Sequence, residues 1–146
     1  MKNLFDDSSR QEIIERVNKL TSDSKPLWGK MSVAQMLAHN IIPMELALNN
    51  KKPARLFMGK IIGGFVKKTL LSPKPFKKNG FTPKEFKIDS EQDFSEQKKK
   101  VLEIINKFRK GAITDKVHPF FGKMSEEEWG QLQYKHLDHH LQQFGV

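Results

Sequence analysis

The chain has 146 residues, the size of one domain and enough to bury a hydrophobic core. It contains no cysteine, which excludes disulfides, thiolate metal ligands and a sulfur nucleophile carried by the protein. Its 26 Lys and Arg residues against 17 Asp and Glu residues give a formal net charge of +9. The first residues lack the apolar run of a secretory signal, and no stretch reaches 18 apolar residues. We therefore expect one cytoplasmic domain spanning residues 1–146.

The positive charge raises the question of a nucleic-acid or membrane partner. The lysines lie in several short clusters, among them Lys67 and Lys68, and Lys98 to Lys100. Aromatic side chains are not interleaved with them as a platform for stacked bases requires. We expect a solvated basic surface without a specific nucleic-acid or membrane partner, and a positive field that attracts a small anionic substrate.

Two helices are predicted in the first fifty residues. A capping box at Ser9 precedes apolar residues at helical spacing and predicts a helix over residues 9–20. A second box at Ser32 predicts a helix over residues 31–49. Proline, tryptophan and glycine in the link between them separate the two helices.

A long connection from Asn49 to Asp93 follows the second helix. Residues 53–71 carry apolar residues at mixed helical spacing, which predicts a short helical excursion broken near Gly63 and Gly64 and packed on the bundle. Residues 72–88 contain too many prolines and glycines for a helix and predict an ordered loop. The alternative for residues 57–71 is an amphipathic membrane anchor.

Two more helices complete the predicted fold. Asp93 caps an apolar stripe that stops at Gly111, and a capping box at Ser125 begins a last helix over residues 125–146. A crossover of some forty residues can return along a bundle about 25 Å tall, so the second and third long helices are expected to be parallel. The sequence thus predicts an all-α four-helix bundle with one long crossover between helices 2 and 3.

The last helix carries three of the five histidines. His136 and His140 lie about 20° to either side of the centre of its inward stripe, whereas His139 lies about 80° from that centre. Side chains four residues apart on a helix have Cβ atoms roughly 5–6 Å apart, so both rings can reach one metal ion. The alternative is a pair of histidines at the core edge, bonded to carbonyls or waters. We expect His139, Trp129 and Gln133 to line a pocket or to support the ligands.

His39 is the candidate for a third ligand. It lies at the edge of the apolar face of the second helix, ~10 Å from its start, while His136 lies ~16 Å from the start of the last helix. These heights agree only if the two helices are antiparallel. Three imidazoles from two helices leave coordination positions open, as in a catalytic site.

These residues carry a resemblance to a known superfamily. The segments LWGKMSVAQMLAH, KNGFTPKEFKI and HPFFGKMSEEEWGQLQYKHLDHHLQQFG resemble the DinB-like superfamily of small metal-binding helical bundles, in a bacterial branch of undefined function. In that superfamily a histidine on the second helix and a His-x-x-x-His pair on the last helix bind a divalent metal. The resemblance implies that His39, His136 and His140 are the ligands. The chain departs from the pattern at Leu141 and Gln142, where the superfamily usually has a basic residue.

The resemblance also implies a function. Superfamily members with assigned activities are largely thiol-dependent transferases and isomerases, so we expect a metal-dependent enzyme that adds a low-molecular-weight thiol to a small electrophilic substrate. A metal-dependent hydrolase and a non-enzymatic metal- or ligand-binding stress-response protein are the alternatives. Zinc or nickel is expected, although imidazole also suits copper and iron. A homodimer is compatible with the sequence, and His118 is expected in a turn away from the ligands.

Overall fold

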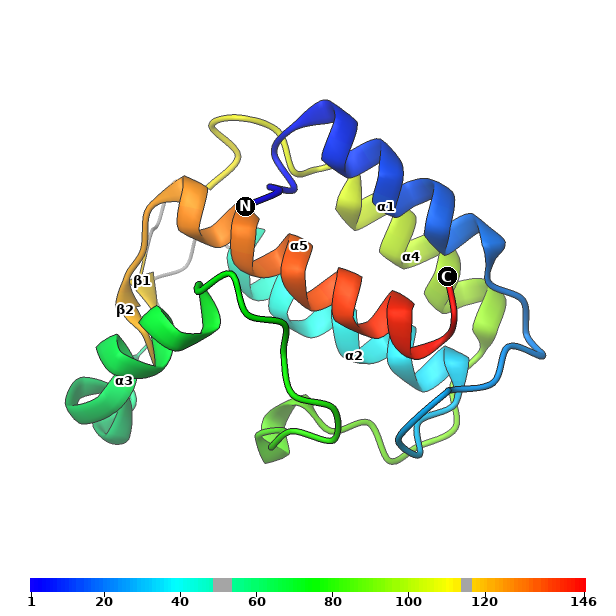
Figure 1. The fold of residues 1–146 in the computed structure, drawn as a ribbon, viewed down its shortest axis with the longest axis horizontal. Helices are drawn as coiled ribbons and strands as arrows, with labels where there is room; N and C mark the ends of the chain where they lie inside the picture. Colours follow the sequence, from blue (N-terminus) through cyan, green and yellow to red (C-terminus); the bar gives the residue numbers. More distant parts are fainter. Residues whose placement is uncertain (49–53, 114–116) are drawn as a thin grey trace.

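The computed structural model describes residues 1–48, 54–113 and 117–146 and is mostly helical, with five α-helices and one short hairpin in these residues (Figure 1). In chain order the elements are α1 (Asp7–Lys19), α2 (Val33–Leu48), α3 (Phe57–Leu70), the 3-10 turn η1 (Lys84–Phe86), α4 (Phe94–Ile105), β1 (Val117–His118), β2 (Gly122–Lys123) and α5 (Glu126–Gln143). The two strands pair antiparallel. The predicted helical class is confirmed.

Helices α1, α2, α4 and α5 lie side by side around a common core (Figure 1). Helices α2 and α5 are antiparallel, while α2 and α4 run in the same direction, in agreement with the expected directions. All four helices contribute large side chains that are at most 1% exposed, among them Ile13, Met36, Ile105 and Trp129. Helix α3 stands apart from these four, at the left in Figure 1.

Three of the four predicted N-terminal caps are confirmed, those at Ser32, Asp93 and Ser125. The Ser125 hydroxyl accepts from the Glu128 amide, and the Glu128 carboxylate accepts from the Ser125 amide. Ser32 makes the same reciprocal pair with Gln35, and Asp93 accepts from the first turn of α4. The predicted start at Ser9 is wrong, because α1 begins at Asp7 and Ser9 is buried inside its first turn.

The third long helix ends earlier than predicted. Helix α4 stops at Ile105, six residues before Gly111. Beyond Ile105 the amides of Lys107 and Phe108 form i−3 turn bonds in place of the α-helical i−4 pattern. The carbonyl of Phe108 accepts from the buried Arg10 guanidinium at 2.9 Å and the Phe108 ring is fully buried, so contacts to α1 also hold this segment. The hairpin β1–β2 was not predicted.

The crossover also differs from its prediction. Helix α3 continues through Gly63 and Gly64 without a break, and the loop that follows contains η1. The expected boundaries at Asn49 and Pro53 lie outside the described residues. None of the described helices combines the length and the apolar character needed to cross a bilayer.

Candidate metal centre

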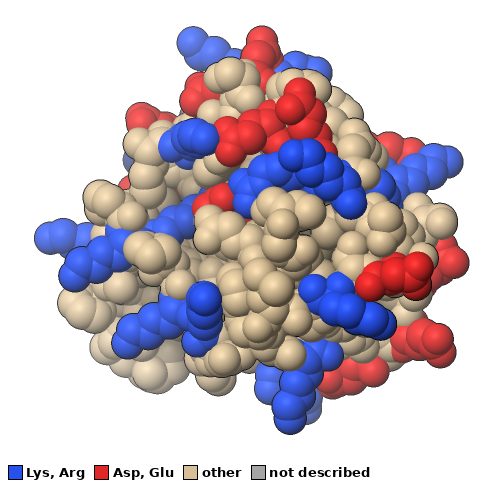
Figure 2. Space-filling model, turned by 45° about the vertical axis from the view of Figure 1, so that its right-hand side comes forward, with Lys and Arg blue, Asp and Glu red and all other residues tan. Residues whose placement is uncertain are grey.

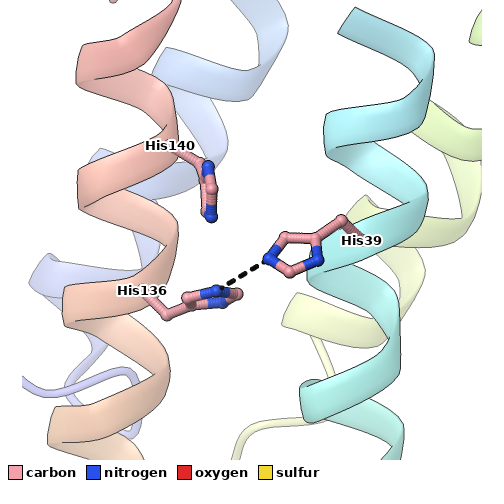
Figure 3. Close-up of side chains that lie close together, drawn as sticks. All are labelled: His39, His136 and His140. Atoms are coloured by element: carbon pink, nitrogen blue, oxygen red, sulfur yellow. Dashed lines mark hydrogen bonds between the residues drawn. The ribbon is translucent and has the colours of Figure 1, made fainter. Parts of the chain in front are cut away.

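His39 of α2 faces His136 and His140 of α5 across the gap between the two helices (Figure 3). One ring nitrogen from each residue lies within 4.8 Å of those of the other two. The ring centroids are 4.7 to 4.9 Å apart. The antiparallel packing of α2 and α5 therefore brings the three predicted ligands to one place.

The ring of His39 is oriented by the crossover loop. Its Nδ1 lies 2.7 Å from the carbonyl oxygen of Phe86, in η1. A carbonyl only accepts, so Nδ1 carries the proton and Nε2 presents a lone pair toward α5. Metal-bound histidines commonly have such a partner on the other ring nitrogen, which fixes the tautomer and the ring orientation.

The ring of His140 is oriented in a similar way. Its Nδ1 lies 2.8 Å from Oε1 of Gln143, and Nε2 of Gln143 donates to the carbonyl of Trp28 at 2.7 Å. The Trp28 carbonyl sets which end of the Gln143 amide is the acceptor, so His140 donates from Nδ1. Its Nε2 is then free for an ion.

The separation between two ring nitrogens fits a shared ion. Nε2 of His39 and Nε2 of His136 are 3.1 Å apart. Two nitrogen ligands of one tetrahedral zinc lie roughly 3.3 Å apart, given bonds of about 2.0–2.1 Å. Without an ion, one of the two nitrogens must carry a proton and donate to the other. With an ion, both present lone pairs to it.

The three imidazoles are neutral at neutral pH, which is the form that binds metal. Burial lowers the pKa of His39, against the opposing effect of its bond to Phe86. Burial, followed by the nearby His140 and His39, lowers the pKa of His136 well below its usual value. Burial also lowers the pKa of His140 to about 3. His136 as a whole residue is partly exposed, while its ring lies among the other histidines.

His139 lies beside the three histidines, with its ring 5.1 Å from that of His140. It is partly exposed and contacts the rings of Trp28 and Phe76, with centroids 5.7 Å away in each case. The Lys78 ammonium lies 4.4 Å from the centre of the Trp28 ring. These side chains form an aromatic wall with one cation next to the histidine cluster.

Two other candidates from the ligand stripe lie deeper in the protein. Trp129 is 1% exposed and packs on His118, 5.1 Å away, at the hairpin end of α5. Gln133 is 1% exposed and donates to the carbonyl of Pro43 in α2. His118 stacks on Phe121, so it belongs to the hairpin rather than to the histidine cluster.

Sequence reasoning missed the groups that orient the rings. The acceptor for His39 is a backbone carbonyl 47 residues away, and a carbonyl has no signature in the sequence. The partner of His140 was visible in part, because Gln143 lies on the same helical stripe. Asp138, next to His139 in the sequence, pairs with Arg16 of α1 at 2.7 Å and is not among the clustered residues.

Fold and site together define a mostly helical protein with three clustered histidines that could hold a metal ion. The chain belongs to the family described as "Protein of unknown function (DUF1569)", whose model matches residues 4–145. Neither a curated protein nor a solved structure matches the chain.

Proposed function

We propose that this protein is a DinB-like metal-dependent enzyme, a four-helix bundle with one long crossover, that transfers a small external thiol to an electrophilic substrate in the cytoplasm. The main observation in support is that His39, His136 and His140 lie close together. The rings of His39 and His140 are also held by hydrogen bonds through Nδ1. Such ring support is typical of metal ligands, because it fixes the tautomer and the orientation of the ring before an ion binds. Zinc and nickel both suit three neutral imidazoles.

The donor set favours a Lewis-acid role. An ion held by three neutral ligands keeps its full positive charge and lowers the pKa of a thiol or water beside it. The chain has no cysteine, so the thiol comes from outside. Asp138 is paired with Arg16 and is not placed to accept a proton. A nucleophile that ionises on the ion without a carboxylate base suits this site. The choice of thiol transfer over hydrolysis rests on the resemblance to thiol-dependent members of the DinB-like superfamily.

The wall beside the cluster suits the proposed substrates. Trp28 and Phe76 offer apolar surface for a small electrophile, and His139 contacts both rings. Lys78 adds a positive charge at the same place, which favours a substrate or thiol with a carboxylate. Burial lowers the pKa of His139 also, so its ring is neutral and able to accept or donate a hydrogen bond.

The test is a metal analysis followed by a thiol screen. Protein purified without chelator is assayed for metal per chain, then incubated with low-molecular-weight thiols and aromatic or epoxide electrophiles. We expect thiol-dependent product from the loaded protein and none from His140→Ala, with circular dichroism showing the same helix content in both. Ester hydrolysis without thiol would favour the hydrolase instead. Full metal loading without turnover of any kind would favour a non-enzymatic metal-binding protein.

A further inference from the structure

The first half of helix α3 packs on the hairpin through its backbone. Its only fully buried residues are Gly59 and Gly63. A Cβ atom at either position would lie 2.3 or 2.1 Å from the carbonyl oxygen of Phe120 in the hairpin. The inward side of the first turns thus has no side chain to bury, and only toward its carboxyl end does this side carry partly buried side chains, Val66, Lys67 and Leu70.

Contacts at both ends hold α3 in this orientation. The amide of Leu56 donates to the carbonyl of Pro119 at 3.0 Å. Lys67 pairs with Glu128 at 2.9 Å. Lys135 of α5 donates to the carbonyls of Leu70 and Ser72 at 2.6 and 2.7 Å. These bonds fix which face of α3 points away from the protein.

The outward face of α3 is apolar. Five large apolar residues lie on an arc about 140° wide, and their exposed fractions are 40 to 77%: Phe57, Met58, Ile61, Ile62 and Phe65. A surface helix of a globular protein normally buries its apolar face. The sequence-based expectation that the bundle buries these residues is wrong, because the glycines occupy the inward side. A contiguous exposed apolar patch of this kind marks an interaction surface.

The excess positive charge of the chain lies in the same region. Residues 46–84 contain ten Lys and Arg and no Asp or Glu, and eight of the ten lie within the described residues 54–84. The remaining residues carry sixteen cations against seventeen anions. In Figure 2 acidic side chains gather at the top and along the right edge, whereas the charged side chains at the lower left are basic.

An open groove lies at the carboxyl end of the apolar face. It has a volume of about 360 Å³ and is lined by Phe65, Lys68, Thr69, Ser72 and Lys74. The two ammonium groups beside an exposed phenyl ring can bind a phosphate whose acyl chains follow the apolar face, whereas the Thr69 and Ser72 hydroxyls donate to backbone carbonyls.

We propose that α3 binds the surface of an anionic lipid membrane. The helix is about 21 Å long, from 14 residues at about 1.5 Å each, and lies in the plane of the membrane with its apolar arc among the acyl chains. Lys60, Lys68 and Lys74 contact lipid phosphates. A second copy of the chain is a poorer partner, because it would bring the same cations and no anion to this face. The proposal is independent of the metal centre.

The test is co-sedimentation with vesicles of phosphatidylcholine alone or mixed with phosphatidylglycerol. We expect binding to the anionic vesicles only, weakened by salt because the charges at the surface are screened. Ile61→Ser combined with Phe65→Ser removes two exposed apolar side chains and should weaken binding about tenfold or more. Lys68→Gln should weaken it about fivefold, from the contribution of one lysine near an anionic surface. Leu27→Ser is the control, since Leu27 is 70% exposed but lies outside α3.

Several outcomes would overturn the proposal. These are no sedimentation with anionic vesicles, equal binding to neutral vesicles, or an equal loss in the Leu27→Ser control. Sedimentation equilibrium of the free protein is the second measurement. A dimer that Ile61→Ser with Phe65→Ser dissociates, together with no vesicle binding, would assign this face to a second copy. Unchanged metal content in these variants shows that the result does not depend on the histidine cluster.

Discussion

At the scale of residues, the three clustered histidines differ in how their rings are held. Nδ1 of His39 donates to the Phe86 carbonyl and Nδ1 of His140 donates to Gln143. Each ring is therefore held in the tautomer that leaves Nε2 unprotonated. His136 contacts His39 through Nε2 and is partly exposed. Metal affinity should therefore depend on the groups that orient the rings as well as on the ligands.

The first prediction separates ligands from neighbours. His136→Ala and His140→Ala should each abolish metal binding, because each removes a nitrogen from the cluster. His139→Ala should leave metal bound, because its ring lies outside the cluster beside Trp28 and Phe76. Metal per chain in the three purified variants measures this. An empty His139→Ala protein beside a loaded His140→Ala protein would reverse the assignment.

The second prediction concerns His118, which is 7% exposed and lies in the hairpin. Its Nδ1 accepts from the amides of Phe120 and Phe121, both at 3.1 Å. Burial, with a smaller effect of Arg55, lowers the pKa of His118 to about 4 from the 6.5 that is usual for histidine. The unfolded chain therefore binds more protons between these values, and the free energy of unfolding falls as the pH drops from about 6.5 to 4. The loss from this group is about 3 kcal/mol.

His118→Asn tests this titration, because the asparagine oxygen can accept in place of Nδ1 and does not titrate. Urea unfolding at pH 7.5 and pH 4.5 measures the difference for both proteins. We expect the variant to be less stable at pH 7.5 but to lose less stability on acidification. The same loss in both proteins would show that His118 does not titrate in this range.

At the scale of elements, the sequence predicted the features that depend on neighbouring residues. The capping boxes at Ser32 and Ser125 were found because their partners lie three residues away. Which side of α3 turns toward the protein could not be predicted in this way. Gly63 was interpreted as a break, whereas it is the point of contact with a hairpin more than fifty residues further on.

The third prediction compares two adjacent glycines in α3. Gly63→Ala should release α3 from the hairpin, because the new Cβ would lie 2.1 Å from a backbone oxygen that cannot move aside freely. Gly64→Ala is the matched control, since nothing lies within 4 Å of its Cβ, and it should stabilise the helix by up to about 1 kcal/mol. Proteolysis within α3 measures the release. Equal cleavage rates in the two variants would contradict the contact.

At the scale of the whole molecule, the helix directions explain why the candidate site was predictable. The heights of His39 and His136 on their helices required α2 and α5 to be antiparallel, and they are. What the sequence could not supply was the path of the crossover loop, which returns along the bundle and places the carbonyl of Phe86 against His39. That path depends on tertiary packing over some fifty residues.

The last prediction is that the metal does not hold the fold together. The core is built from large apolar side chains of α1, α2, α4 and α5, and α2, α4 and α5 have side-chain caps, so the protein should remain helical without an ion. An ion at 100 times its dissociation constant adds about 2.7 kcal/mol by mass action. For a chain of this size that shifts the melting temperature by roughly 5–10 °C. Thermal melts followed by circular dichroism, with and without chelator, measure the shift. A complete loss of helical signal on chelation would show instead that the histidine cluster is a structural site, as in a zinc finger.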